Sequence, residues 1–283
     1  MEVTAEAAKL LTLYLDEKSA LFRHTEAREV LVPWLTYRVR STFRLGGTLV
    51  DLGGGLNLTN AVLAKLGMSV HVVDLLDSYF PHSTLQTDGL AQVEFLEGQG
   101  VTFHKTDLTS CDLRDYFGLE SVDVVCSYHA LEHMHHSPRP MLQSALDVMK
   151  SGGTFFCEVP NAVNALKRVR VLLGQTNYQP FHDFWASDVW VGHIREYTVD
   201  DLRALSRRLG LVDVVVQGRN WYGTLYEQVP NYHLAKAIDR MLQLRPGLCG
   251  SLFLAGRKPQ RSAEEGDSPV AFNPGTGNRR SRV

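Results

Sequence analysis

Cysteine is scarce in this sequence, and its placement argues against the roles that cysteine usually has. The four cysteines, Cys111, Cys126, Cys157 and Cys249, form no CxxC pair. Two of them lie in apolar, strand-like runs. We therefore expect buried free thiols instead of metal ligands or disulfides.

Long apolar runs and an excess of basic charge are also missing. No stretch of the 283 residues approaches the ~18 consecutive apolar residues of a transmembrane helix. The first residues, MEVTAEAAKLLTLYLDEK, are acidic and amphipathic and contain no signal-peptide core. A net charge of -2 supplies no basic field for nucleic acid. We therefore expect a cytoplasmic protein with no integral membrane segment and no nucleic-acid partner; its oligomeric state stays open.

The composition that is present, 44% hydrophobic and 21% charged, can form the core of one large domain or of one domain with additions. Residues 1–45 hold two helical patterns, over 3–24 and 25–42, which we interpret as an N-terminal helical cap. The tail 259–283 is rich in Gly, Pro and Ser, which predicts disorder. The main domain is therefore assigned to residues 46–258.

Strand and helix patterns alternate through this domain. Short apolar runs predict strands at 48–52, 69–73, 101–104, 122–127, 154–159, 211–217 and 250–256. Helical patterns between them cover 58–67, 84–99, 137–149 and 199–209. Repeating βα units predict a mostly parallel sheet covered on both faces, with an antiparallel finish. Residues 161–197 interrupt the rhythm with a short basic helix and an aromatic segment, which we interpret as a lid over an acceptor site.

The stretch 48–67 joins a strand, a glycine turn and a helical pattern, an arrangement that holds nucleotide-like ligands. A Walker loop does not fit, because no lysine follows the glycines. A dinucleotide fingerprint has its first two glycines in Gly53 and Gly55, but Leu58 replaces the third. The remaining pattern is an acid, Asp51, two residues before the first glycine.

Polar residues also end the next strands. Asp74 closes the second strand, and Asp77 is a competing candidate there. Asp107 and Leu108 follow the third strand, and Ser127 ends the fourth. Carboxyl ends of parallel strands meet at one edge of a sheet, so these side chains are expected near the glycine turn.

This order of residues resembles class I S-adenosylmethionine-dependent methyltransferases. The chain also resembles a subfamily that includes quinone-precursor, glycan and natural-product O-methyltransferases and methionine-biosynthesis-associated methyltransferase-like proteins. The usual pattern there is SxxxLEHxxxP, a glycine turn, a strand ending in Pro-Asn, and HxRxYT. The matching residues, within 45–215, are Ser127, Leu131, Glu132, His133, Pro138, Gly152, Gly153, Pro160, Asn161, His193, Arg195, Tyr197 and Thr198. The chain departs from the pattern at Asn57 and Ser151.

The resemblance implies a Rossmann-like, doubly wound, mostly parallel seven-stranded sheet with an antiparallel last strand. It implies S-adenosyl-L-methionine as cofactor and S-adenosyl-L-homocysteine as product. Asp74 would then accept from both ribose hydroxyls, Asp107 would contact the adenine amino group, and Ser127 would face the methionine portion. The complete set of implied cofactor residues is Asp51, Gly53, Gly55, Asp74, Asp107, Leu108 and Ser127.

Methylation of a hydroxyl group requires removal of a proton, and histidine titrates near neutrality. His133 matches the family pattern, His129 lies one turn earlier, and His193 lies in the lid. His182 and Asp183 are alternative bases. His129 and His133 have the HxxxH spacing of metal ligands, but HExxH is absent and we expect no metal.

The lid favours a ring-shaped or sugar-like acceptor, because aromatic residues are dense in it. They are Tyr178, Phe181, Phe184, Trp185 and Trp190. The basic residues of the preceding helix, Lys167, Arg168 and Arg170, favour a solvated face and leave peripheral membrane contact open.

Two functions are therefore compatible with the sequence. The first is O-methylation of a small molecule, such as a natural product, a sugar or a quinone-like compound, with N- and C-methylation left open. The second is a non-catalytic or regulatory S-adenosylmethionine-binding protein on the same fold.

Overall fold

The computed structural model describes residues 2–18, 21–22, 28–76, 83–186, 190, 192–220, 225, 229 and 231–260. The competing candidate Asp77 lies outside the described residues, as does the predicted disordered tail beyond residue 260.

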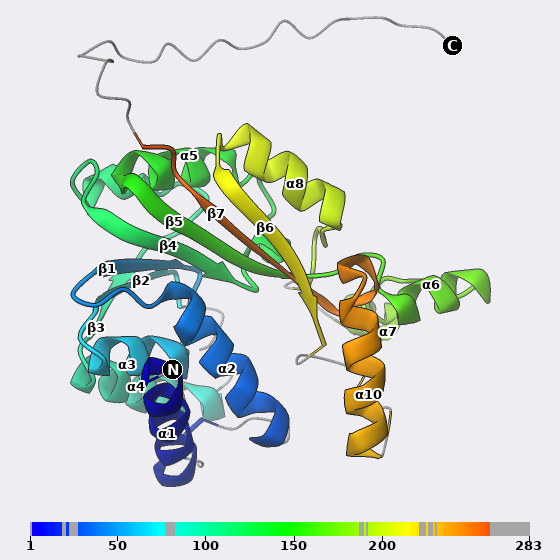
Figure 1. Cartoon of the computed structure of the whole chain (residues 1–283). Helices are drawn as coiled ribbons and strands as arrows, with labels where there is room; N and C mark the ends of the chain where they lie inside the picture. Colours follow the sequence, from blue (N-terminus) through cyan, green and yellow to red (C-terminus); the bar gives the residue numbers. More distant parts are fainter. Residues whose placement is uncertain are drawn as a thin grey trace, which may run out of the picture.

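Seven strands form one sheet in the order β3-β2-β1-β4-β5-β7-β6 (Figure 1). Their bounds are β1 Thr48–Leu52, β2 Ser69–Asp74, β3 Val101–Lys105, β4 Val122–Tyr128, β5 Met149–Pro160, β6 Val212–Arg219 and β7 Ser251–Arg257. Strands β1 to β5 pair in parallel, and β7 is antiparallel to both β5 and β6. The predicted fold, mostly parallel with an antiparallel last strand, is confirmed.

Helices cover both faces of the sheet. Successive strand residues point to opposite sides, and in the central strands both sets are apolar, so each face must be covered. In β1, Leu49 belongs to the apolar cluster on the side of α1 to α4, and Val50 belongs to the cluster on the side of α5 and α8. The bounds are α1 Glu2–Glu17, α2 Arg28–Thr42, α3 Leu58–Lys65, α4 Ser83–Gly98, α5 Arg139–Val148 and α8 Val199–Arg208. This two-sided burial explains why the central strands are continuously apolar.

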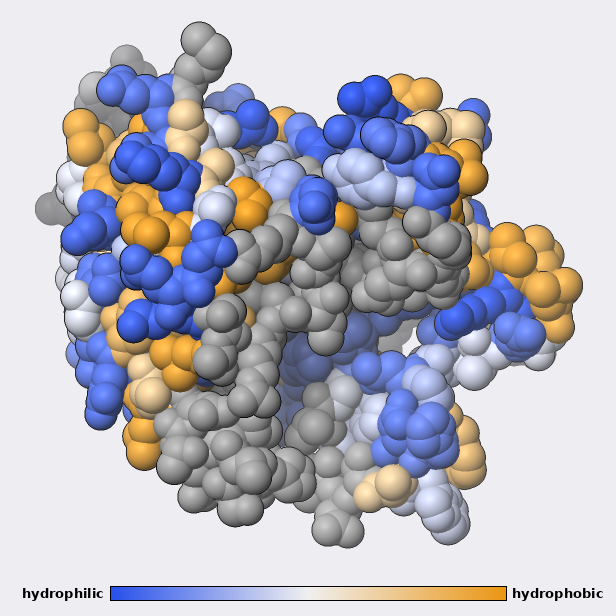
Figure 2. All heavy atoms as spheres, turned by 90° about the horizontal axis from the view of Figure 1, so that it is seen from below, coloured by the Kyte–Doolittle hydropathy of each residue, from blue (hydrophilic) through white to orange (hydrophobic). Residues whose placement is uncertain are grey.

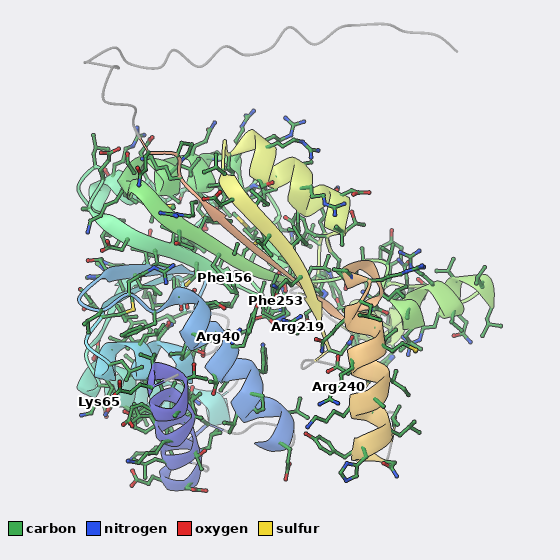
Figure 3. The ribbon with its side chains drawn as sticks, in the orientation of Figure 1. Arg40, Lys65, Phe156, Arg219, Arg240 and Phe253 are labelled. Carbon is green, nitrogen blue, oxygen red and sulfur yellow. The ribbon has the colours of Figure 1, made fainter. Side chains whose placement is uncertain are left out.

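Helix α2 packs on the β5–β7 part of the sheet. The Tyr37 ring lies 5.1 Å from Phe253 and 6.3 Å from Phe156 between centroids, and the Arg219 guanidinium lies 5.2 Å from the same tyrosine ring. Phe156, Phe253 and Arg219 are labelled beside the helix in Figure 3. The first helices therefore share a core with the sheet.

The boundary between α5 and β5 differs from the prediction. We expected a helix over 137–149, but β5 already begins at Met149. Gly152 has a φ of +78°, and a Cβ on Gly153 would lie 2.8 Å from the Lys150 carbonyl oxygen. The glycines thus form a tight, irregular turn of the backbone near the start of β5, where the register between β4 and β5 also shifts. The first helix also ends earlier than predicted, at Glu17, and Pro33 lies inside α2 without dividing it.

The remaining helices stand around one end of the sheet. Among the described residues they are α6 Ala165–Leu172, α7 Phe181–Ala186 and α10 Tyr232–Gln243. Short 3-10 turns are formed elsewhere in the chain, at η2 Leu113–Asp115, η3 Leu131–His133 and η4 Pro246–Leu248. Figure 1 shows α6 projecting from the body, and Figure 2 shows apolar side chains at its tip, where Leu172 is 85% exposed. Within the described ranges, no helix combines the length and apolar character needed to cross a bilayer.

Candidate active site

The glycine turn after β1 is pressed against the segment that follows β4. Gly53 has a φ of +68°, which glycine adopts without strain, and its N–H donates to the Val73 carbonyl oxygen at 2.9 Å. A Cβ on Gly53 would lie 2.4 Å from Ala130 Cβ and 3.4 Å from Leu108 Cδ1. The structure therefore brings the predicted residues Gly53 and Leu108 together, with Ala130 as an additional neighbour.

Asp51 is wholly buried beneath this turn. Its Oδ2 accepts from Asn60 Nδ2 at 2.8 Å, and its Oδ1 has no hydrogen-bond partner among the described residues, although the Cys126 thiol, a weak donor, is close. Burial raises the pKa of Asp51 to about 6, against the opposing effects of Asn60 and Cys126. Buried polar atoms are normally hydrogen-bonded, so this carboxylate oxygen could accept a hydrogen bond from an N–H or O–H group of a ligand.

Asp74 ties the end of β2 to the glycine turn. Its Oδ2 accepts from Gly55 N at 3.0 Å, and its Oδ1 accepts from Leu76 N at 2.7 Å. Burial raises the pKa of Asp74, and these two N–H groups partly offset the effect. The carboxylate is thus held at the position predicted for it, with a second lone pair on each oxygen for a ligand hydroxyl.

Asp107 is exposed and closes a small turn. Its Oδ1 accepts from both the N–H and the hydroxyl of Thr109 at 2.8 Å, and these bonds lower the pKa of Asp107. Among the hydrogen bonds of its side chain within the described ranges, none is made by Oδ2. The adenine contact predicted for this residue stays a prediction.

Ser127 is buried in β4 with an unpartnered hydroxyl among the described residues. Asp51 Oδ1 and Asn60 Oδ1, at the end of β1 and the start of α3, are also buried and unpartnered among the described residues. Buried polar atoms are normally paired, so these unpartnered atoms beside the glycine turn are an unusual feature. Asp51 and Asn60, joined by a hydrogen bond at 2.8 Å, fit a polar ligand at this turn, and Asn60 was missed by the sequence reasoning.

His129 is held between two buried carboxylates. Its Nδ1 lies 3.0 Å from Glu132 Oε1 and its Nε2 lies 3.0 Å from Glu158 Oε1, while its backbone has a φ of +51°. Burial alone would lower the pKa of His129, but the two carboxylates outweigh burial and raise the pKa to about 9. The ring is therefore an imidazolium at neutral pH, donating from both nitrogens.

Helix α2 completes the cluster around Glu158. The Glu158 carboxylate accepts from Trp34 Nε1 at 2.9 Å and from Arg38 Nε at 2.7 Å, and Arg38 is also stacked 4.4 Å from the Tyr128 ring. Burial would raise the pKa of Glu158, but Arg38 and His129 hold it below its ordinary value. Sequence reasoning missed this cluster, although an acid inside the apolar run 154–159 was the available signal.

His133 and His193 come from distant segments and meet in space. Their ring centroids are 5.1 Å apart, and His193 Nδ1 lies 2.8 Å from Glu196 Oε1. The Glu132 carbonyl oxygen accepts from the N–H groups of residues 194 and 195, at 2.7 and 3.2 Å. These backbone bonds fasten the segment after β4 to the segment before α8. Glu196 was not predicted.

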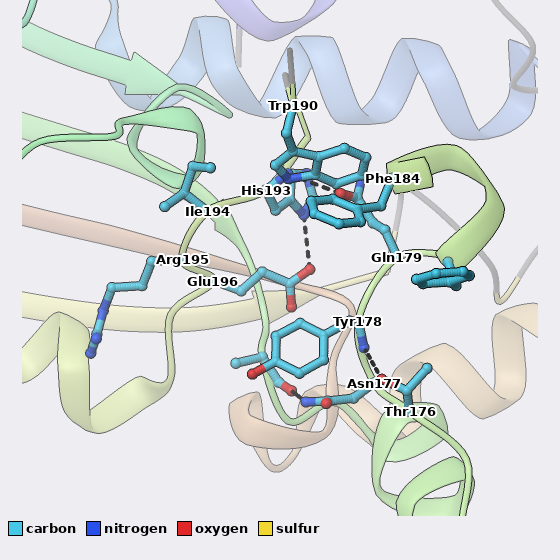
Figure 4. A pocket seen from close by; sticks show the side chains of 12 residues that line it. Thr176, Asn177, Tyr178, Gln179, Phe184, Trp190, His193, Ile194, Arg195 and Glu196 are labelled. Atoms are coloured by element: carbon cyan, nitrogen blue, oxygen red, sulfur yellow. Dashed lines mark hydrogen bonds and ion pairs between the residues drawn. The ribbon is translucent and has the colours of Figure 1, made fainter. Parts of the chain in front are cut away.

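A cavity of about 770 Å³ lies beside His193 (Figure 4). The residues that line it all belong to the predicted lid: Ala162, Thr176, Asn177, Tyr178, Gln179, Phe181, Phe184, Trp190, His193, Ile194, Arg195 and Glu196. In Figure 4 the rings of Phe184 and Trp190 lie together, and their centroids are 5.4 Å apart. An aromatic cavity of this size accommodates a small organic molecule.

Some lid residues do not contribute to this cavity. Trp185 is 78% exposed, and His182 pairs with Asp183 on the outer surface at 2.8 Å. Arg195 lines the cavity, but its guanidinium is paired with Asp201 at 3.0 Å and points away from the aromatic side chains in Figure 4.

A comparison with protein families matches the chain over residues 22–217 to the family described as "Methyltransferase domain". No curated protein matches the chain. Among solved structures, a SAM-dependent methyltransferase from Archaeoglobus fulgidus is similar with a TM-score of 0.52 at 15% identity, covering 87% of this chain and 99% of that chain. One from Mesorhizobium loti has a TM-score of 0.51 at 18% identity, covering 81% and 97%.

A third similar structure is phosphoethanolamine N-methyltransferase 2 of Haemonchus contortus, in complex with phosphomonomethylethanolamine and S-adenosylhomocysteine. Its TM-score is 0.50 at 16% identity, and the match covers 86% of this chain and 56% of that chain. At these identities the likeness to solved structures shows the fold.

Proposed function

We propose that this chain, which belongs to the methyltransferase-domain family and is an S-adenosylmethionine-dependent class I methyltransferase, acts on a small molecule. In this proposal it methylates a hydroxyl group of a molecule held in the lid cavity. The acceptor classes we propose are natural products, sugars and quinone-like compounds. The observation that carries this proposal is the aromatic cavity beside the His193–Glu196 pair.

The donor side is proposed from the buried polar atoms around the glycine turn. S-adenosylmethionine, when bound, supplies an electrophilic methyl group on a sulfonium. Asp51 Oδ1 and the Ser127 hydroxyl, both buried and unpartnered within the described ranges, would receive polar groups of its methionine portion. Asp74 would take the ribose hydroxyls, while Asp107 and Leu108 would flank the adenine. Positioning of donor and acceptor in line can contribute ~7–11 kcal/mol to catalysis.

Among the three candidate bases, His193 is the best placed. It lines the cavity, and the Glu196 carboxylate at Nδ1 fixes the ring so that Nε2 can accept a proton. His133 contacts His193 and is an alternative. His129 is already protonated between two carboxylates, so we assign it a positioning role on Glu132.

A cytoplasmic location is part of the proposal, since Cys111, Cys126, Cys157 and Cys249 are all free thiols in the structure.

Calorimetry with S-adenosylhomocysteine, followed by a methyl-transfer assay over phenols, quinols and sugars, tests this function. We expect stoichiometric binding and transfer to at least one hydroxyl acceptor. For that acceptor, Trp190→Ala should raise KM without changing cofactor affinity, because Trp190 lines the cavity. Trp185→Ala is the matched control, since Trp185 is exposed and outside the cavity wall.

Folded protein that fails to bind S-adenosylhomocysteine would refute the donor assignment. Binding without transfer to any acceptor of the panel would support the non-catalytic alternative instead.

A further inference from the structure

We infer that Glu132, His133 and His193 form a binding site for a divalent transition-metal ion such as Zn²⁺. One potential ligand atom from each residue lies within 4.8 Å of the others. The residues come from η3 and from the segment before α8, which the Glu132 carbonyl oxygen ties together by accepting from the N–H groups of residues 194 and 195. The site is therefore built by the fold, and not by the spacing of one helix.

The Glu132 carboxylate is the anchor of this site. The residue is wholly buried, and its Oε2 has no hydrogen-bond partner among the described residues. A buried carboxylate oxygen without a donor is costly, so a positive ligand at this place would remove an existing penalty. The other oxygen, Oε1, contacts His129 Nδ1 at 3.0 Å, which fixes the orientation of the carboxylate.

His193 is oriented in the way that metal-bound histidines usually are. Its Nδ1 is engaged by Glu196 Oε1 at 2.8 Å, which leaves Nε2 as the ligand atom. Glu196 is itself paired with Lys167. The third ligand, His133, has an exposed side chain whose ring contacts the His193 ring.

The donor set selects the class of metal. Two imidazoles and one carboxylate suit Zn²⁺ and neighbouring divalent ions better than Mg²⁺ or Ca²⁺, which prefer oxygen ligands. In tetrahedral coordination, ligand atoms at about 2.0–2.2 Å from one ion lie about 3.3–3.6 Å apart. The observed limit of 4.8 Å therefore requires the ligand atoms to move toward one another by up to about 1.5 Å when an ion binds.

This ligand set differs from the HxxxH pair that the sequence suggested. Both ring nitrogens of His129 already contact carboxylates, and the segment containing His133 is a 3-10 turn instead of a regular helix. The prediction of no metal rested on that pair. It did not consider His193, which is 60 residues away from His133 in the sequence.

The location gives the ion a role, which rests on the proposed O-methylation. His193 belongs both to the ligand set and to the cavity wall. Three protein ligands leave a coordination position open, as in catalytic metal sites. With Nε2 of His193 bound to the ion, the ion takes the place of His193 as the base: an acceptor hydroxyl bound there would lose its proton to water more readily. Its oxygen would form the new O–CH₃ bond while the S–CH₃ bond breaks, with the electron pair remaining on sulfur.

Metal binding to the chelator-treated full chain tests the inference, with Zn²⁺ alone in calorimetry and Co²⁺ alone in visible absorption. We expect one ion per chain. The affinity should fall at least 10-fold in His193→Gln and in Glu132→Gln. His135→Gln should bind like the unchanged protein, because the exposed His135 is outside the ligand set. Should Glu132→Gln fail to fold, the part-exposed His193 provides an independent variant.

Absence of saturable one-to-one binding, unchanged binding by His193→Gln, or an equal loss in His135→Gln would each overturn the site. S-adenosylhomocysteine binding is measured on the same samples. Cofactor binding without metal binding would remove this inference and leave the proposed function standing. Metal binding without cofactor binding would do the reverse.

Discussion

Replacing Glu158 by glutamine should strongly destabilise the protein. The wholly buried carboxylate accepts from Trp34 Nε1, Arg38 Nε and His129 Nε2, at 2.9, 2.7 and 3.0 Å. Glutamine offers one acceptor oxygen and a donor NH₂ group that opposes the donors facing it. The Arg38 side chain is only 5% exposed and would stay buried without its counter-charge. Breaking a buried pair from one side costs about 3–5 kcal/mol.

This loss is a large share of the ~5–15 kcal/mol free energy of unfolding of a typical protein. It should therefore lower the urea concentration at the midpoint of unfolding, followed by tryptophan fluorescence and circular dichroism. Asp123→Asn is the control. It removes a 2.8 Å pair with Lys150 whose side chains are 45% and 27% exposed, and such pairs contribute about 0–1 kcal/mol. A loss in Glu158→Gln no larger than in the control would refute the reasoning that the cluster is charged and tightly coupled.

Three further predictions concern other positions. Gly53→Ala should lose more stability in urea unfolding, and more cofactor affinity in calorimetry, than Gly46→Ala. Both glycines have φ near +65°, but of these two only Gly53 would place a Cβ against a close neighbour, at 2.4 Å. Burial raises the pKa of Asp51 to about 6, so the ionised carboxylate destabilises the folded protein near neutral pH. The free energy of unfolding of Asp51→Asn should therefore be about 2–3 kcal/mol higher than that of the unchanged protein at about pH 7.5, and this gain should disappear near pH 4. The variant should also bind the cofactor more weakly, and an equal change in stability at both pH values would contradict the pKa shift. Burial and, to a lesser extent, His104 lower the pKa of His71. The protein should therefore lose stability as the pH falls below about 6.5, because protonation of His71 favours the unfolded chain. In His71→Gln, the free energy of unfolding from urea curves should fall less steeply with decreasing pH, and an equally steep fall would argue against this role.

The sheet and its donor side could be predicted because they depend on local patterns. Strand, glycine turn and helix follow one another within 48–67, and parallel strands must place their carboxyl ends at one edge. Gly53 and Leu108 are close in the structure for this reason. Asp74 is likewise fixed by the glycine turn that it was expected to adjoin.

The cluster around Glu158 and the meeting of His133 with His193 could not be predicted in the same way. Glu158 is surrounded by side chains that are 29 and 120 residues away in sequence, and no local pattern selects such partners. His193 is brought beside Glu132 because the next two residues donate backbone hydrogen bonds to the Glu132 carbonyl oxygen, and such irregular segments carry no periodic signal. Matching motifs identified these histidines as candidates, but only the fold shows that they are neighbours.

The position of β7 between β5 and β6 determines when the sheet can be completed during synthesis. Thr154 pairs with Arg257, and Pro160 pairs with Ser251, so an apolar strand waits for a partner made about a hundred residues later. Until then the β5 edge, TFFCEVP, is an unpaired strand rich in aromatic and apolar residues, which favours association between chains. A chain that stops before residue 251 would keep that edge open permanently. The last strand therefore protects the completed protein from aggregation through the β5 edge as well as completing its fold.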